Sequence, residues 1–261
     1  MRASSEDTTS APDAAVLCLV LTGRGSDPGL VRGPMIHEWG GGREEHGLLG
    51  AGTVAGHIVE CGAQCTGGNF TNWRAIPDLA RVGYPIIEAS ADGSFVVTKH
   101  EGTGGSVTFD TVAHQLAYEM GDPAAYLTPD VIADFTSFSI TEDGTDRVRI
   151  AGVKGRPATP YYKVSMSYSD GWKSVGELTI SGPEALEKAR LCAQIVWDRL
   201  ASDGCEYAPS ERLEEYVGAG VCHRGIADAE TTSPPEVVLR MGVKGPDPAQ
   251  AIGSARGRER G

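Results

Sequence analysis

The chain has 261 residues, with 23 lysines and arginines against 35 aspartates and glutamates, so its formal net charge at pH 7 is −12. This length allows one large domain or two small ones, whose cores need no covalent staples. The negative charge argues against binding to nucleic acids or anionic membranes, because both require a positively charged footprint.

The N-terminal sequence and the cysteines predict where the protein works. No apolar run approaches the roughly 20 residues that span a bilayer, and the polar N-terminus lacks the apolar core of a secretory signal. Six cysteines are scattered along the chain, and a protein of this size does not depend on disulfides. We therefore expect a cytoplasmic protein with reduced thiols.

The chain begins with a polar segment, residues 1–13, that we expect to be a disordered leader. The apolar run AAVLCLVLTG, residues 14–23, then predicts a strand buried on both faces, as in a parallel sheet. Arg24 and Asp27 follow at its C-terminal end, which is where ligands bind in open α/β sheets. We predict that both residues contact a substrate.

Residues 44–66 predict one long helix, which Gly67 and Gly68 would end. Several small residues line this helix: Gly52, Ala55 and Gly56. Each interior glycine costs about 1 kcal/mol relative to alanine, so another backbone is expected to approach closely in compensation. The segment is predicted to be a buried helix.

A hairpin and a second helix follow. The runs IIEAS and SFVVTK predict two strands joined by a turn at residues 91–93. The glycine-rich loop HEGTGG then leads into a helix capped by Thr108 or Asp110 and running to Met120. Residues 126–135 return the chain towards a strand.

The second half alternates between apolar and polar residues. DRVRIAGVKG and PYYKVSMSYSDGWKSVGELTISG predict three antiparallel strands, the last two joined at residues 169–171. Ser181 and Pro183 start a helix, and EEYVGAGV and PPEVVLRMGVKG predict two final strands. Residues 14–248 are thus expected to form a single α/β domain, with a mixed sheet, a buried small-residue helix and an antiparallel strand section; residues 249–261 form a flexible tail.

The stretch HIVECGAQCTGGNFTNW, residues 57–73, carries most of the reactive side chains. On a helix, His57, Cys61 and Cys65 lie one above another, and with Cys222 or His223 they would make a zinc site. No CxxC pair supports this interpretation, and buried thiols are common as small apolar groups.

Two other interpretations of the same stretch involve catalysis or binding. Cys61 is a candidate nucleophile with His57 as its base, although a position inside a helix does not lower a thiol pKa. Alternatively, a pocket rim is formed by Glu60 and by the segment that follows, namely Gln64, Thr66, Gly67, Gly68 and Asn69. A carboxylate in an apolar helix needs a partner or a raised pKa, and a purely structural pair with an arginine is the other explanation.

The loop at residues 99–108, KHEGTGGSVT, has the composition of an anion site. Backbone N–H groups of a glycine-rich turn at a helix N-terminus can hold a phosphate or carboxylate, and Lys99 would add charge. The candidate residues are Lys99, Glu101, Gly104 and Gly105. The glycine spacing fits neither a P-loop nor a dinucleotide-binding turn, and ordinary strand-to-helix turns also use glycine.

These segments also carry a family resemblance. The phrases ECGAQ, TGGNF, EGTGG and GDPAAYLTPDV, within a match from about Val20 to Gly245, resemble the acyclic terpene utilisation AtuA family. The resemblance implies a role in citronellol and geraniol catabolism, beside enzymes that handle branched acyl-CoA thioesters, and a ferredoxin-like domain as a partner. The match corresponds to the C-terminal half of the family's main domain. Cys65 departs from the family pattern, which argues against the zinc site, so neither a metal nor a cofactor is expected.

The expected function is a catabolic enzyme acting on a branched acyl or acyl-CoA substrate, with Glu60 as acid/base, Cys61 as nucleophile and His57 beside them. The alternative is a non-catalytic truncated paralogue that acts as a partner or scaffold of a full-length family member; a misplaced gene start would also explain the short chain. The expected partners are the small-molecule substrate, further copies of the chain and a ferredoxin-like domain.

Overall fold

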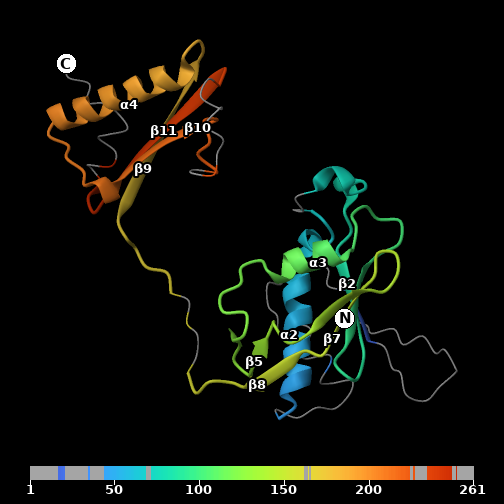
Figure 1. Cartoon of the computed structure of the whole chain (residues 1–261). Coiled ribbons are helices and arrows are strands. Elements are labelled where there is room, and N and C mark those ends of the chain that lie inside the picture. The colour runs from blue at the N-terminus through green and yellow to red at the C-terminus, as the bar shows by residue number, and fades with distance from the viewer. Residues whose placement is uncertain are drawn as a thin grey trace. The chain divides into compact units, whose positions relative to one another are not determined.

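The computed structural model describes residues 17–20, 35, 44–68, 72–161, 164, 166–223, 226, 234–248 and 251. The chain divides into two compact units, Met1–Ser165 (unit 1) and Met166–Gly261 (unit 2), where the sequence predicted one domain over residues 14–248 (Figure 1). The predicted leader and nearly all of the predicted tail lie outside the described residues.

Unit 1 contains a five-stranded sheet in the order β1-β2-β3-β7-β6. Its strands are β1 (Leu17–Val20), β2 (Pro85–Ala89), β3 (Phe95–Lys99), β6 (Ser139–Glu142) and β7 (Val148–Ala151). The predicted hairpin is confirmed, since β2 and β3 pair antiparallel across a turn that Gly93 makes with a positive φ of 82°. The parallel pairing expected for residues 14–23 is wrong, because β1 pairs antiparallel with β2 at the sheet edge. An apolar run alone does not distinguish these two environments.

The buried small-residue helix is α2 (His46–Glu60), in which every residue from Leu48 to Val59 is buried. It ends before the predicted boundary at residue 66, because Gly62 adopts a positive φ of 56° that an α-helix does not tolerate. A 3₁₀ turn, η1 (Gly62–Gln64), follows, and Cys65 therefore lies beyond the helix.

A second, three-stranded sheet covers α2 (Figure 1). Its order is β4-β5-β8, with β4 (Tyr126–Leu127), β5 (Val131–Asp134) and β8 (Lys154–Pro157). Another backbone approaches α2 closely here, at a glycine that the sequence prediction did not single out: a Cβ on Gly50 would lie 3.1 Å from the Lys154 carbonyl oxygen, and one on Gly155 would overlap the carbonyl oxygen of His46.

The remaining helices of unit 1 are short. The predicted cap is confirmed for α3 (Phe109–Leu116), where Thr108 accepts a hydrogen bond from the Thr111 N–H. This helix stops at Leu116 rather than Met120, and Glu119 adopts a left-handed φ of 50°. Two 3₁₀ turns, η2 (Trp73–Ala75) and η3 (Leu79–Arg81), precede β2.

Unit 2 is a three-stranded antiparallel sheet, β10-β11-β9, with one long helix on one face (Figure 1). Its elements are β9 (Trp172–Ser181), α4 (Ala185–Ser202), the 3₁₀ turn η4 (Pro209–Glu211), β10 (Arg212–Val217) and β11 (Glu236–Gly245). The helix packs through alanines, Ala185, Ala189 and Ala193, onto Val237 and Leu239 of the central strand. The predicted helix and the two final strands are confirmed.

One predicted strand of this region is wrong. The described residues between 160 and 168 form no strand, and β9 pairs with β11 instead of with the segment before residue 169. Val164, Met166 and Tyr168 alternate with polar positions in sequence but, like Tyr161, are strongly exposed. Alternation produces a strand only where a neighbouring strand supplies hydrogen bonds.

The helices of the described ranges include none that is both long and apolar enough to cross a membrane. Each unit has a buried apolar core. In unit 1 the core lies between α2 and the five-stranded sheet, with Ile58, Ile87, Phe95, Val97 and Ile150 fully buried. Helices and antiparallel strands therefore occur together in each unit, as the predicted α/β class requires.

Candidate functional site

Three sequence-predicted residues, His57, Glu60 and Cys61, lie together where α2 ends. The end of α3 lies against them, since the buried Gln115 side chain donates a 3.0 Å hydrogen bond to the His57 carbonyl oxygen. Glu119, just beyond α3, is close enough for its charge to act on Glu60. We call these residues and two aromatic neighbours, Tyr126 and Phe135, the α2-end cluster.

His57 is buried within this cluster, with a side chain that is 1% exposed. Its ring makes edge-to-face contacts with Tyr126 and Phe135, at centroid distances of 5.6 and 5.3 Å. Burial lowers the pKa of His57, because the apolar surroundings disfavour the charged ring. Nδ1 lies 3.3 Å from Glu60 Oε1 without hydrogen-bond geometry. The backbone of Gln115 and Tyr118 and the charge of Glu119 act against burial and raise the pKa, but burial is the larger effect. The lowered pKa favours the neutral form of the ring.

Glu60 has the electrostatic signature of an acid/base group. Its side chain is 11% exposed, and its pKa is raised first by burial and then by the charge of Glu119. No lysine or arginine forms an ion pair with it in the described parts of the chain, so the structural carboxylate–arginine pair is not observed there. Its position at the negative end of the α2 dipole also disfavours ionisation. A carboxyl group with a raised pKa can both accept and donate a proton nearer to neutral pH.

Cys61 is less suited to be a nucleophile. Burial raises the pKa of its thiol, and the charges of Glu60 and Glu119 raise it further, while a hydrogen bond with Gln115 acts in the opposite direction. The thiol is thus protonated at neutral pH, whereas the thiolate is the reactive form.

The predicted stack of His57, Cys61 and Cys65 does not form, because α2 ends before Cys65. Cys65 instead lies fully buried in the core of unit 1, where burial raises the pKa of its thiol. Among the residues that the structure describes, no group of three or more histidine, cysteine, aspartate or glutamate side chains is placed to hold a metal ion.

The turn after α2 directs its polar groups inward. The Thr66 hydroxyl is buried and donates to the carbonyl oxygens of Gly83 and Ala63, and the Gly68 N–H donates to Ala63 at 2.8 Å. Gly67 has a positive φ of 98°, and a Cβ there would lie 2.8 Å from Ile76. These residues shape the turn, and the half-buried Gln64 precedes them. The other predicted contacts, Asn69, Arg24 and Asp27, lie outside the described residues.

Backbone hydrogen bonds hold the glycine-rich loop to the segment that precedes β2. The N–H groups of Gly104 and Gly105 donate to the carbonyls of Arg81 and Pro77, both at 2.8 Å. At the start of α3, the Phe109 N–H donates to the Glu142 carboxylate at 2.6 Å. The amides expected to cradle an anion are therefore already engaged.

Lys99 also has a structural partner. Its side chain is 8% exposed, with Nζ 3.2 Å from Asp146 Oδ2, and it donates to the Thr103 carbonyl at 2.9 Å. Of the predicted loop contacts, Glu101 is exposed to solvent. Lys99 thus anchors the loop to the fold and does not offer a free charge to a ligand.

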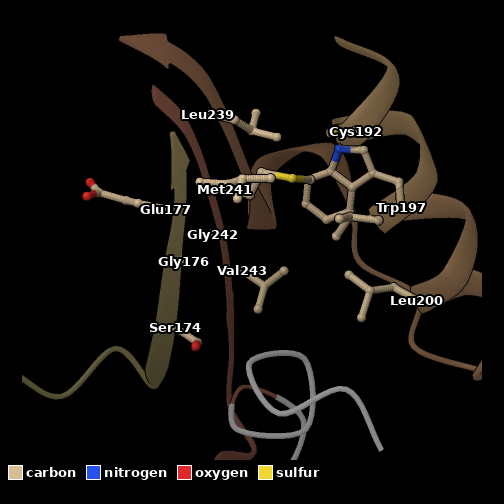
Figure 2. Close-up of a pocket in the computed structure, with 12 residues that line it drawn as sticks. Ser174, Gly176, Glu177, Cys192, Trp197, Leu200, Leu239, Met241, Gly242 and Val243 are labelled. Carbon is tan, nitrogen blue, oxygen red and sulfur yellow. The ribbon is translucent and has the colours of Figure 1, made fainter. Parts of the chain in front are cut away.

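Unit 2 contains a cavity that was not predicted from the sequence. A space of about 220 Å³ lies between α4 and the sheet; Figure 2 shows the Met241 and Trp197 side chains directed towards one another inside it. Its other lining residues are Ser174, Gly176, Glu177, Leu178, Cys192, Val196, Leu200, Leu239, Gly242 and Val243. Cys192, Val196 and Leu200 follow an i, i+4, i+8 spacing, which places them on one face of α4. This spacing is the sequence pattern that could have indicated the cavity.

Comparison with known proteins bears on the whole chain. A family model described as "Acyclic terpene utilisation family protein AtuA" matches residues 17–259, which confirms the resemblance seen in the sequence. No curated protein and no solved structure matches the chain.

Proposed function

Because the chain belongs to the acyclic terpene utilisation family AtuA, we propose that it is a catabolic enzyme of acyclic terpenes, acting on a branched acyl or acyl-CoA substrate. Glu60 serves as its general acid/base. The proposal places the reaction in the cytoplasm, at the α2-end cluster, and needs no metal or cofactor. The family description supports terpene utilisation, and the cluster supports proton transfer.

One observation carries the assignment of Glu60: its carboxyl group lies 3.3 Å from the buried His57, and burial and the charge of Glu119 raise its pKa. As a carboxylate, Glu60 takes a proton from the carbon beside the substrate carbonyl; as the acid, it returns a proton to that carbon or to a leaving oxygen. A neutral His57 adds no positive charge that would lower the basicity of Glu60.

The aromatic side chains give the cluster an apolar side. Tyr126 and Phe135 are partly buried and contact the His57 ring, and a branched hydrocarbon chain packs favourably on such surfaces.

The test is proton exchange. The purified chain would be incubated in D₂O with branched acyl-CoA thioesters and with the matching free acids, and deuterium or water addition would be followed by mass spectrometry. We expect turnover with one of these classes, at least about a hundredfold slower in Glu60→Gln, since general acid/base groups contribute that much.

Glu187→Gln makes the same chemical change at an exposed carboxylate of α4 and serves as the matched control. The proposal is wrong if a substrate turns over equally well in Glu60→Gln and in Glu187→Gln. Thermal shift with the same compounds separates binding from chemistry, because a ligand that binds only the native state raises the melting temperature.

The second candidate is a non-catalytic partner of another family member. It is favoured by the exposed apolar side chains of β9, namely Trp172, Val175 and Leu178. Under this proposal no compound is turned over or shifts the melting temperature, whereas the chain alters the activity of a full-length family member when the two are mixed.

A further inference from the structure

The long strand β9 lies at the edge of the unit 2 sheet, where the described strands leave one side of its backbone unpaired. Eight of its ten residues are exposed, including Trp172 at 57%, Val175 at 50% and Leu178 at 51%. Natural proteins shield such edges, because an exposed, apolar edge strand readily pairs with another chain.

The register with β11 shows which side chains share a face of the sheet. Ile180 and Leu178 lie opposite the buried Val237 and Leu239, so the even-numbered residues of β9 lie on the face that α4 covers. Lys173, Val175 and Glu177 therefore lie on the other face, where Glu177 approaches Arg240 at 3.9 Å.

We propose that β9 pairs with β9 of a second copy of this chain, with Val175 on the two-fold axis. This register places Lys173 opposite the partner's Glu177, twice per dimer, and Val175 opposite itself. It joins two three-stranded sheets into one six-stranded sheet with both α4 helices on the same face. The inference goes beyond the proposed function and does not depend on it.

Charge complementarity selects this register. In an antiparallel pair, residues that lie opposite each other have their side chains on the same face of the sheet. The two-fold axis must therefore pass beside a residue of β9 that lies opposite its own copy. Each residue of β9 thus defines one possible register. An axis at Glu177 or Lys173 would place like charges opposite one another, and an axis at Ser174 or Gly176 would leave both charges without partners. Val175 is the axis position that pairs both.

Side chains on the sheet face that α4 covers support the same register. With Val175 on the axis, Trp172 lies opposite the partner's Leu178, and an aromatic–aliphatic pair of this kind stabilises a sheet. Leu178 also lines the 220 Å³ cavity, so the partner's Trp172 would extend its apolar wall. On α4, the exposed Ile195 lies on the side of Lys188, which donates to Ser181 at the end of β9. That side of the helix faces the proposed axis.

The test is sedimentation of the full chain over a wide range of concentration. We expect a species of twice the 27.4 kDa chain mass. Lys173→Glu and Glu177→Lys should each weaken the dimer about tenfold, because two attractive cross-strand pairs become repulsive. The double variant, which swaps the charges, should restore it.

Lys154→Glu makes the same charge change in unit 1 and should leave the dimer constant unaltered. A chain that remains monomeric at every concentration would overturn the proposal. So would a dimer that both single variants leave unchanged, since the interface would then lie elsewhere. Because Lys173 and Glu177 are exposed, the variants should fold, and circular dichroism checks this.

Discussion

Nδ1 of His57 and Oε1 of Glu60 lie 3.3 Å apart at the end of α2, and folding shifts the pKa values of the two groups in opposite directions. Burial is the main cause in both cases, because it disfavours the charged form of a base and of an acid alike. The pH dependence of stability therefore separates their contributions.

For Glu60, the folded state binds the proton more tightly than the unfolded chain, whose pKa is near the ordinary 4.5. Its contribution to stability therefore falls as pH rises from 4.5 through the higher folded pKa. Glu60→Gln should raise the free energy of unfolding at neutral and alkaline pH and give no gain at acid pH. Urea unfolding across this range measures it; an equal change at every pH would contradict the prediction.

For His57 the sign is reversed. The unfolded chain takes up a proton near pH 6.5 and the folded state does so only at lower pH, so stability falls as pH drops below 6.5. His57→Phe keeps an aromatic ring against Tyr126 and Phe135, and should flatten this acid-side loss. His114→Phe makes the same change at an exposed position of α3. It is the control variant and should leave the loss of stability at acid pH in place.

Cys61 is expected to react slowly with iodoacetamide at neutral pH, because its thiol pKa is raised and alkylation requires the thiolate. Cys222 is exposed and provides an internal reference for the rate. In Glu60→Gln, which removes one of the nearby negative charges, Cys61 should react faster while Cys222 does not change. Peptide mass spectrometry gives both rates; a fast Cys61 in the unaltered chain would revive the nucleophile hypothesis.

Lys99→Met should destabilise unit 1 by about 1–3 kcal/mol, because it removes the bond to Thr103 and the charge opposite Asp146. Combined with Asp146→Asn, the loss should be less than the sum of the two single losses, as expected for contacting groups. If Lys99 bound the substrate instead, Lys99→Met would abolish a ligand-induced thermal shift with little change in the stability of the free protein.

Gly155→Ala should cost more than about 4 kcal/mol, because the new Cβ would overlap the His46 carbonyl oxygen and force α2 and β8 apart. Gly121→Ala is the matched control: a Cβ there meets no atom within 4 Å, and the change should lie within about 0.5 kcal/mol of zero. Thermal unfolding of the two variants side by side measures the difference.

The elements that the sequence predicted well have strong local signals. The β2–β3 hairpin has a turn sequence between two β-branched runs, and α4 begins after Ser181 and Pro183 with well-spaced alanines. The pairing of β1 and the end of α2 were missed for the same physical reason. Whether an apolar strand lies at an edge, and whether Gly62 adopts a positive φ, is decided by contacts distant in sequence.

In the candidate site, too, local features could be predicted from the sequence and contacts between distant residues could not. His57, Glu60 and Cys61 are neighbours along one helix, so their proximity could be predicted. Gln115 reaches His57 across 58 positions of sequence, and Glu119 arrives with it; no local pattern reports either. The glycine-rich loop has the composition of an anion site, but its Gly104 and Gly105 N–H groups donate to the carbonyls of Arg81 and Pro77. Composition alone does not show that these amides are already hydrogen-bonded.

The enclosure of α2 has a consequence for how ligand binding can be detected. Since residues Leu48 to Val59 are buried between two sheets, their amides should exchange with deuterium only when unit 1 unfolds as a whole. The uptake rate of a peptide from this helix therefore reports the global opening of unit 1. A compound that binds at the α2-end cluster would slow exchange along the entire helix, including positions that it never touches.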